Sequence, residues 1–159
     1  MHNPAKIRID FSVIAFSLVY FCVMFFNYQS RGFLSTVLLL IASSVILGAF
    51  GSHGLKDVLT TKKFEVYQTA CQYLSIHSIA LLLLLVLNNT TNYRLSPKTI
   101  YSLFFGIVVF CISLFLVSVA ELLNQNGLNK LGMIAPIGGL MMILGYVFAA
   151  IDLFKKPAQ

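Results

Sequence analysis

The chain has 159 residues, of which 58% are hydrophobic and only 10% are charged, and its mean hydropathy is +0.88. A water-soluble domain carries roughly 25% charged residues, so this composition excludes an ordinary soluble fold and predicts an integral membrane protein. The net charge of +6 comes from Lys and Arg in short segments between apolar runs, where such residues meet lipid head groups, so we expect the bilayer and no nucleic acid as their partner.

Residues 1–31 are predicted to form an N-terminal extension with a hydrophobic helix. A polar, basic start is followed by the uncharged run of residues 11–26. This order is typical of a signal sequence, but no small-x-small cleavage site follows, which favours a retained helix. Met24 offers another explanation, in which residues 1–23 are an upstream extension that results from the choice of start codon. The intact mass of the native protein would distinguish the two.

The apolar run at residues 33–50 predicts the next membrane span. Gly48, Gly51 and Gly54 come at intervals of three and lie on roughly one face if the helix continues. Small residues on that face would let another helix approach closely. Equally, the glycines would end the helix and start a turn. His53 lies in the same segment, where it would touch head groups or cap the helix end.

A polar helix is predicted over residues 62–87, after a charged interfacial connection. At 100° per residue, Gln68 and Gln72 fall on one face of this helix, and Tyr73 and His77 fall nearly opposite. We expect other helices to surround it and to supply hydrogen-bonding partners on two sides. One interpretation is a polar cavity for a ligand or a proton path, and the other is interhelical hydrogen bonding that fixes the bundle.

Two further apolar runs, at residues 99–119 and 131–154, predict the last two spans. Pro136 lies inside the last run, where it should kink the helix and leave a carbonyl without its bond. Gly138 and Gly139 would allow a neighbouring backbone to approach and fill the resulting gap.

Together, the runs predict an all-α integral membrane protein. A four-helix transmembrane bundle over residues 32–154 follows the additional N-terminal hydrophobic helix in residues 1–31, and residues 155–159 form a basic C-terminal tail. Lys and Arg are divided almost evenly between the two sides of the membrane, so their distribution does not decide the orientation.

The sequence contains no recognisable constellation for catalysis or metal binding. Asp57 and Glu65 lie near lysines, which is typical of surface ion pairs. His53 and His77 would supply only two metal ligands. The three cysteines lie inside apolar runs without metal-binding spacing and are interpreted as small buried hydrophobes. We therefore expect no enzymatic activity, no cofactor and no metal.

Three motifs make the chain resemble a known family. LGAFGSHGLK at residues 47–56, YQTACQY and a histidine at residues 67–77, and LGMIAPIGG at residues 131–139 are similar, in this order, to the small membrane proteins catalogued as domain of unknown function 423, or UPF0382. The resemblance covers about residues 32–154 and implies a compact four-helix membrane protein, with no established activity to transfer. Ser52 stands where alanine is usual, and Ala135 where threonine is usual. The motif residues that carry over are Gly48, Gly51, His53, Gly54, Tyr67, Gln68, Tyr73, His77, Pro136, Gly138 and Gly139.

We expect this protein to be a non-enzymatic module of the bacterial cytoplasmic membrane. It would act as a scaffold, an assembly factor or an accessory subunit that contacts other membrane subunits or a second copy of itself. The alternative is a small transporter or a ligand-binding bundle that uses the polar helix at residues 68–77. An open cavity around His77 and the two glutamines would favour the alternative, and a packed seam would favour the first hypothesis.

Overall fold

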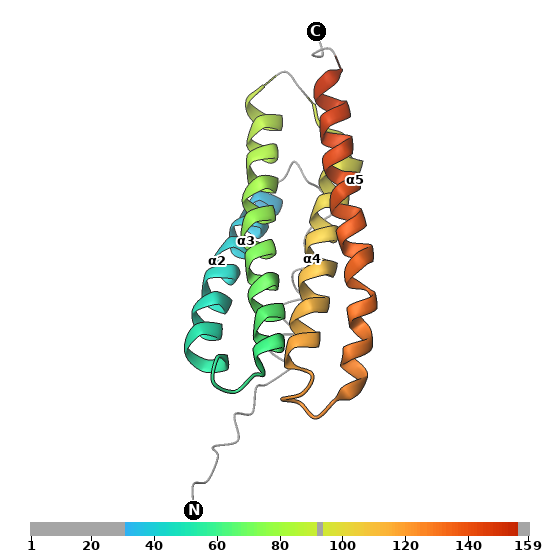
Figure 1. Ribbon diagram of the computed structural model, residues 1–159. Helices are drawn as coiled ribbons and strands as arrows, with labels where there is room; N and C mark the ends of the chain where they lie inside the picture. Colours follow the sequence, from blue (N-terminus) through green and yellow to red (C-terminus); the bar gives the residue numbers. More distant parts are fainter. Residues whose placement is uncertain (1–30, 92–93, 156–159) are drawn as a thin grey trace, which may run out of the picture.

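A computed structural model describes residues 31–91 and 94–155, so the helix predicted within residues 1–30 lies outside the described part. Four long helices lie side by side and alternate in direction (Figure 1). Each is long and apolar enough to cross a membrane, and the described residues include no β-strand. The predicted all-α bundle of four spans is therefore confirmed. The helices are α2 (Arg31–Phe50), α3 (Thr61–Thr90), α4 (Pro97–Val119) and α5 (Ala135–Phe154).

The first helix continues past its closely spaced glycines before it ends. Residues Gly51–Leu55 form a π-helical turn, η1, in which the Lys56 N–H donates to the Gly51 carbonyl at 3.0 Å. A short turn then reverses the chain into α3. Of the two interpretations of the glycines, helix continuation therefore holds as far as Leu55, and the turn follows only after it.

The connection from α3 to α4 is fixed by side chains that bond to the backbone. The Leu95 N–H donates to the Asn88 side chain at 2.8 Å. Ser96 is the N-cap of α4, and its hydroxyl accepts from the Thr99 N–H at 3.4 Å. Pro97 opens the helix, where its missing N–H would have no partner in any case. This sequence of residues sets the start of α4.

The α-helical part of the last span begins later than the sequence predicts. A 3₁₀ helix, η2 (Asn126–Met133), precedes α5, which begins at Ala135 and therefore has Pro136 in its first turn. Proline is tolerated there because the first N–H groups of a helix have no intrahelical acceptor. For this reason, Pro136 does not produce the predicted kink.

α4 lies at the centre of the packing. It packs against α3 on one side and α5 on the other, and α2 packs against α3. The core contains side chains from α2, α3 and α4 that are completely buried, among them Phe33, Leu81, Leu103 and Ile107. These large aliphatic and aromatic groups fill the space between the helices.

Glycines bring α4 and α5 into backbone contact. A Cβ atom added at Gly138 would lie 2.5 Å from the Phe110 backbone nitrogen, and one added at Gly106 would lie 2.8 Å from the Met142 nitrogen. At Gly139, the nearest atoms would be at an ordinary 3.8 Å. Gly138 thus provides the close approach expected from the small-residue motif, and Gly139 faces a looser contact.

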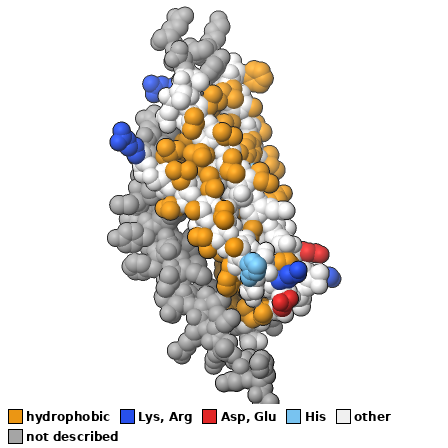
Figure 2. Space-filling view, turned by 90° about the vertical axis from the view of Figure 1, so that its left-hand side faces the viewer, with side chains coloured by type: hydrophobic (Ala, Val, Ile, Leu, Met, Phe, Trp, Pro, Cys, Tyr) orange, Lys and Arg blue, Asp and Glu red, His pale blue; other side chains and the backbone are white. Residues whose placement is uncertain are grey.

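Apolar side chains also cover the outside of the bundle. Figure 2 shows them over the middle of one face, with charged side chains towards its two ends. On α2, Val45 and Ile46 are both 67% exposed, and on α5 Ile143 is 60% exposed. A soluble protein rarely exposes so continuous an apolar surface, whereas the hydrocarbon core of a bilayer would solvate it.

Candidate functional site

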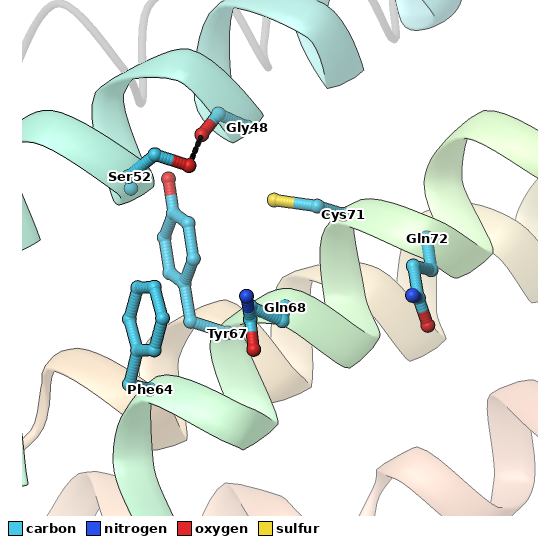
Figure 3. A pocket seen from close by; sticks show the side chains of 8 residues that line it. Gly48, Ser52, Phe64, Tyr67, Gln68, Cys71 and Gln72 are labelled. Carbon is cyan, nitrogen blue, oxygen red and sulfur yellow. Dashed lines mark hydrogen bonds between the residues drawn. The ribbon is translucent and has the colours of Figure 1, made fainter. Parts of the chain in front are cut away.

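The two halves of residues 48–77 meet at one pocket between α2 and α3. The pocket has a volume of about 180 Å³. In Figure 3, Ser52 on one wall faces side chains of α3 on the other, among them Gln68, Cys71 and Gln72. None of the residues that line it is charged. They are Gly48, Gly51, Ser52, Phe64, Tyr67, Gln68, Cys71 and Gln72.

Tyr67 joins the two walls of the pocket. Its hydroxyl donates to the Leu47 carbonyl of α2 at 2.7 Å, and its ring packs against Phe115 of α4 with the centroids 5.2 Å apart. The ring also covers Gly51 so closely that an added Cβ atom there would collide with it. Gly51 is therefore the glycine of this motif at which another helix makes its closest approach.

Gly48 and Gly54 have different surroundings. Among the described residues, an added Cβ atom at Gly48 would meet nothing within 4 Å. At Gly54, it would meet only the Phe50 ring of the preceding turn, at 3.2 Å. At neither position does contact with another described helix require a glycine.

Gln68 and Gln72 are exposed at the mouth of the pocket. Within the part of the chain that the structure describes, their amides have no hydrogen-bond partner. No helix among the described residues therefore covers the glutamine face of α3, where the sequence predicts a neighbouring helix.

The length of α3 explains why the glutamines can be exposed. At 1.5 Å per residue, its 30 residues span about 45 Å, which exceeds the roughly 30 Å of the hydrocarbon core. Counting about 20 residues back from Leu87 places the boundary of that core near Gln68. Gln68 then lies at the level of the head groups, and Gln72 lies one turn deeper.

His77 and Tyr73 lie on another side of α3, where His77 is half-buried and Tyr73 is 39% exposed. Nδ1 of His77 lies 2.7 Å from the hydroxyl of Tyr146 on α5, within hydrogen-bonding distance. The Tyr73 ring packs against His77 and Phe110 at centroid distances of 5.1 and 4.7 Å. These groups form interhelical contacts and do not line the pocket.

His53 is separate from both features. It is exposed in η1, near the start of α3, whereas His77 lies 16 residues, or about 24 Å, along that helix. The described residues contain no group of three or more His, Cys, Asp or Glu side chains that could hold a metal ion. His53 and His77 are therefore not brought together as a pair.

A polar cluster that the sequence does not predict lies at the opposite end of the bundle. Asp152 of α5 is 6% exposed, and its Oδ2 accepts from the Ser96 N–H and the Thr99 hydroxyl, each at 2.7 Å. Its Oδ1 forms an ion pair with Lys155 at 2.7 Å. A carboxylate at the N-terminus of α4 also complements the helix dipole. Two sequence features could have indicated this cluster: an Asp at the end of an apolar run and a Ser-Pro-x-Thr cap. They lie more than 50 residues apart, so the sequence does not show that they meet.

Lys63 binds to the C-terminal end of α4. Nζ of Lys63 donates to the Val117 carbonyl at 2.8 Å and to the Asn129 side chain at 2.6 Å. A cation is favourable at the C-terminus of a helix, where carbonyl groups have no intrahelical donor. Lys63 thus connects α3, α4 and η2 at this end of the bundle.

The fold defines a small, multi-span helical membrane protein. The family model described as "Protein of unknown function (DUF423)" matches residues 47–139, and the chain belongs to this family. The matched region includes η1, the pocket, His77 and the first turn of α5, and thus all three motifs that first suggested the resemblance.

Bacterial membrane proteins are among the relatives. The UPF0382 membrane protein of Staphylococcus haemolyticus is 35% identical over 112 residues, which cover 70% of this chain and 86% of the relative. That of Staphylococcus saprophyticus is 34% identical over 108 residues, covering 68% and 84%. The UPF0382 membrane protein YwdK of Bacillus subtilis is 32% identical over 113 residues, covering 70% and 87%. No solved structure matches the chain.

Proposed function

We propose that this protein is a non-enzymatic accessory module of a membrane complex, acting as a scaffold, an assembly factor or a small subunit. In this role, the four helices form a rigid body whose lipid-facing surface contacts other membrane subunits. The proposal concerns how the protein assembles with others and involves no chemical step.

The contact of His77 with Tyr146 is the observation that carries this proposal. A proton path or a substrate channel would need polar groups along a water-filled space. Here, His77 lies within hydrogen-bonding distance of Tyr146. Completely buried apolar side chains such as Leu81 and Ile107 fill the bundle interior. These contacts favour a polar residue that holds helices together over one that conducts.

Mild detergent extraction followed by native mass measurement tests the proposal. We expect the full chain to leave the membrane in a complex of defined stoichiometry. Val45→Trp on α2 and Ile143→Trp on α5 form a matched pair, because both positions are exposed but lie on different helices. One should weaken the complex and the other should not. A protein that is strictly monomeric, and that co-purifies with no other membrane protein, would refute the proposal.

The pocket supports the ligand-binding form of the alternative function. Its uncharged polar lining favours binding at the side of the bundle and gives no support to transport through its centre. A reconstituted flux assay separates the two forms. Transport would require His77→Ala and Gln72→Ala to reduce solute or proton flux, and we expect no flux above that of empty vesicles.

A further inference from the structure

The pocket between α2 and α3 combines space, hydrogen-bonding groups and a defined depth in the membrane. We propose that it binds the neutral glycerol region of a membrane lipid, whose acyl chains then lie along the adjacent faces of α2 and α3. This goes beyond the accessory role, because it assigns a ligand class to the pocket.

The size of the pocket suits a small polar group. Its 180 Å³ has room for several water molecules or for one glycerol-sized group, but not for a sugar nucleotide or a haem. Gly48 leaves the space open, because no atom of the described residues lies within 4 Å of the position that its Cβ atom would occupy. The glycine thus contributes to the volume of the pocket without contacting another helix.

The hydrogen-bonding groups in the pocket suit a hydroxyl or an ester. Each glutamine amide offers both donors and an acceptor, and within the described residues neither Gln68 nor Gln72 uses them. The Ser52 hydroxyl already donates to the Gly48 carbonyl at 3.0 Å, but its oxygen can still accept. These side chains can therefore bind a ligand group that both donates and accepts hydrogen bonds.

The absence of charge in the lining selects against ionic groups. No Lys, Arg, Asp or Glu is among the eight lining residues. A phosphate or an ammonium group would lose its hydration there without gaining a counter-ion. The recognised group is therefore neutral, and any phosphate of the same lipid would lie outside the pocket, towards the head groups.

The depth of the pocket matches the glycerol region of a bilayer. Gln68 lies near the boundary of the hydrocarbon core, and Gln72 lies about 6 Å inside it. One turn further towards the membrane centre, Ile76 on α3 is 61% exposed, and Val45 on α2 is 67% exposed. These residues would contact the acyl chains that continue from a bound glycerol group.

Photo-crosslinking in vesicles tests the proposal. The full chain is reconstituted in phosphatidylcholine vesicles that contain a diacylglycerol with a photoreactive group near its glycerol. A parallel set contains the corresponding phosphatidylglycerol. We expect cross-links concentrated on residues 68–72 in peptide mass mapping. Labelling by both lipids identifies the shared glycerol-ester region as the recognised group, and labelling by diacylglycerol alone identifies its free hydroxyl.

Matched variants make the test specific. Gly48→Phe places a ring in the pocket, and its Cβ atom meets no described atom within 4 Å. We expect it to reduce cross-linking at residues 68–72 at least fivefold. Ile46→Phe adds the same ring at a position 67% exposed and outside the pocket, and it should leave cross-linking unchanged. Gln72→Leu should also reduce it, by removing the hydrogen bonds while keeping the helix apolar.

Cross-links spread evenly over the lipid-facing helices, or unaffected by both Gly48→Phe and Gln72→Leu, would overturn the proposal. Circular dichroism of each variant confirms that its helices are intact before cross-linking is compared. The outcome is independent of the accessory role, because loss of lipid cross-linking in Gly48→Phe need not change the mass of the extracted complex.

Discussion

Gly51 and Gly48 occupy the same motif and the same pocket, yet their surroundings differ. The Tyr67 ring fills the space beside Gly51, whereas the space beside Gly48 is open. Sequence spacing places both glycines on one helical face but does not report what lies opposite each. Only the position of Tyr67, on the next helix, distinguishes them.

Gly51→Ala should destabilise the protein by about 1–3 kcal/mol, because the added methyl group forces Tyr67 out of its contacts with Leu47 and Phe115. Gly48→Ala is the matched control, since it meets no atom and gains up to about 1 kcal/mol of helix propensity. Unfolding in detergent, followed by circular dichroism, measures both. Equal stability of the two variants would contradict this account of Gly51.

The His77–Tyr146 contact should contribute modestly to stability. Hydrogen bonds between membrane helices average about 0.6 kcal/mol and reach about 1.7 kcal/mol. A double-mutant cycle with His77→Phe and Tyr146→Phe isolates this pair, because both changes keep an aromatic ring at the substituted position. We expect a coupling energy in that range, and additive effects of the two substitutions would show that the bond contributes nothing.

At the scale of the helices, α4 has a different polar anchor at each end. Asp152 accepts hydrogen bonds from an N–H and a hydroxyl group at the start of α4. Lys63 donates a hydrogen bond to a carbonyl near the end of α4. Both anchors match the sign of the helix dipole. The central helix is thereby fixed along its axis relative to α5 and α3.

Asp152→Ala should cost about 1–3 kcal/mol, because it leaves the Ser96 N–H and the Thr99 hydroxyl without their acceptor. Asp152→Asn keeps an acceptor and should cost less. Lys155→Gln is the control: the Lys155 side chain is 66% exposed, so its ion pair should contribute less than about 1 kcal/mol. Chemical unfolding ranks the three variants by their free energy of unfolding. A loss of stability in Lys155→Gln as large as in Asp152→Ala would refute this prediction.

The apolar runs predicted the four spans because a helix that crosses lipid must be apolar over most of its length. The start of the last α-helix was misplaced, since residues 126–133 form η2 and hydropathy does not distinguish a 3₁₀ helix from an α-helix. The pairing of His77 with Tyr146 was also not predictable. Periodicity assigns a residue to a face, but the identity of the neighbouring helix depends on the order of packing.

For the whole molecule, basic residues are balanced between the two ends of the bundle. Arg94 and Lys98 lie at the end where α3 meets α4, and Lys56 and Lys62 lie at the opposite end. Orientation in the membrane follows the side with more Lys and Arg in its short loops. A small change in charge is therefore expected to have a large effect on topology.

Replacing Arg94 and Lys98 with Gln should bias the bundle so that the Lys56 end faces the cytoplasm, and replacing Lys56 and Lys62 with Gln should give the opposite bias. A reporter fused to the C-terminus, or labelling of single cysteines placed in the loops, measures the fraction in each orientation. Identical topology in both double variants would show that residues other than these four determine orientation.

The π-helical turn of η1 makes this segment sensitive to insertions and deletions. A π turn holds one more residue than an α turn, so the loss of any one residue from Gly51–Leu55 would restore a regular helix. The chain beyond it would then rotate by about 100°. Leu55 would leave its cluster with Leu59 and Tyr67, and the pocket would lose one wall. The length of η1 therefore cannot change without moving the start of α3.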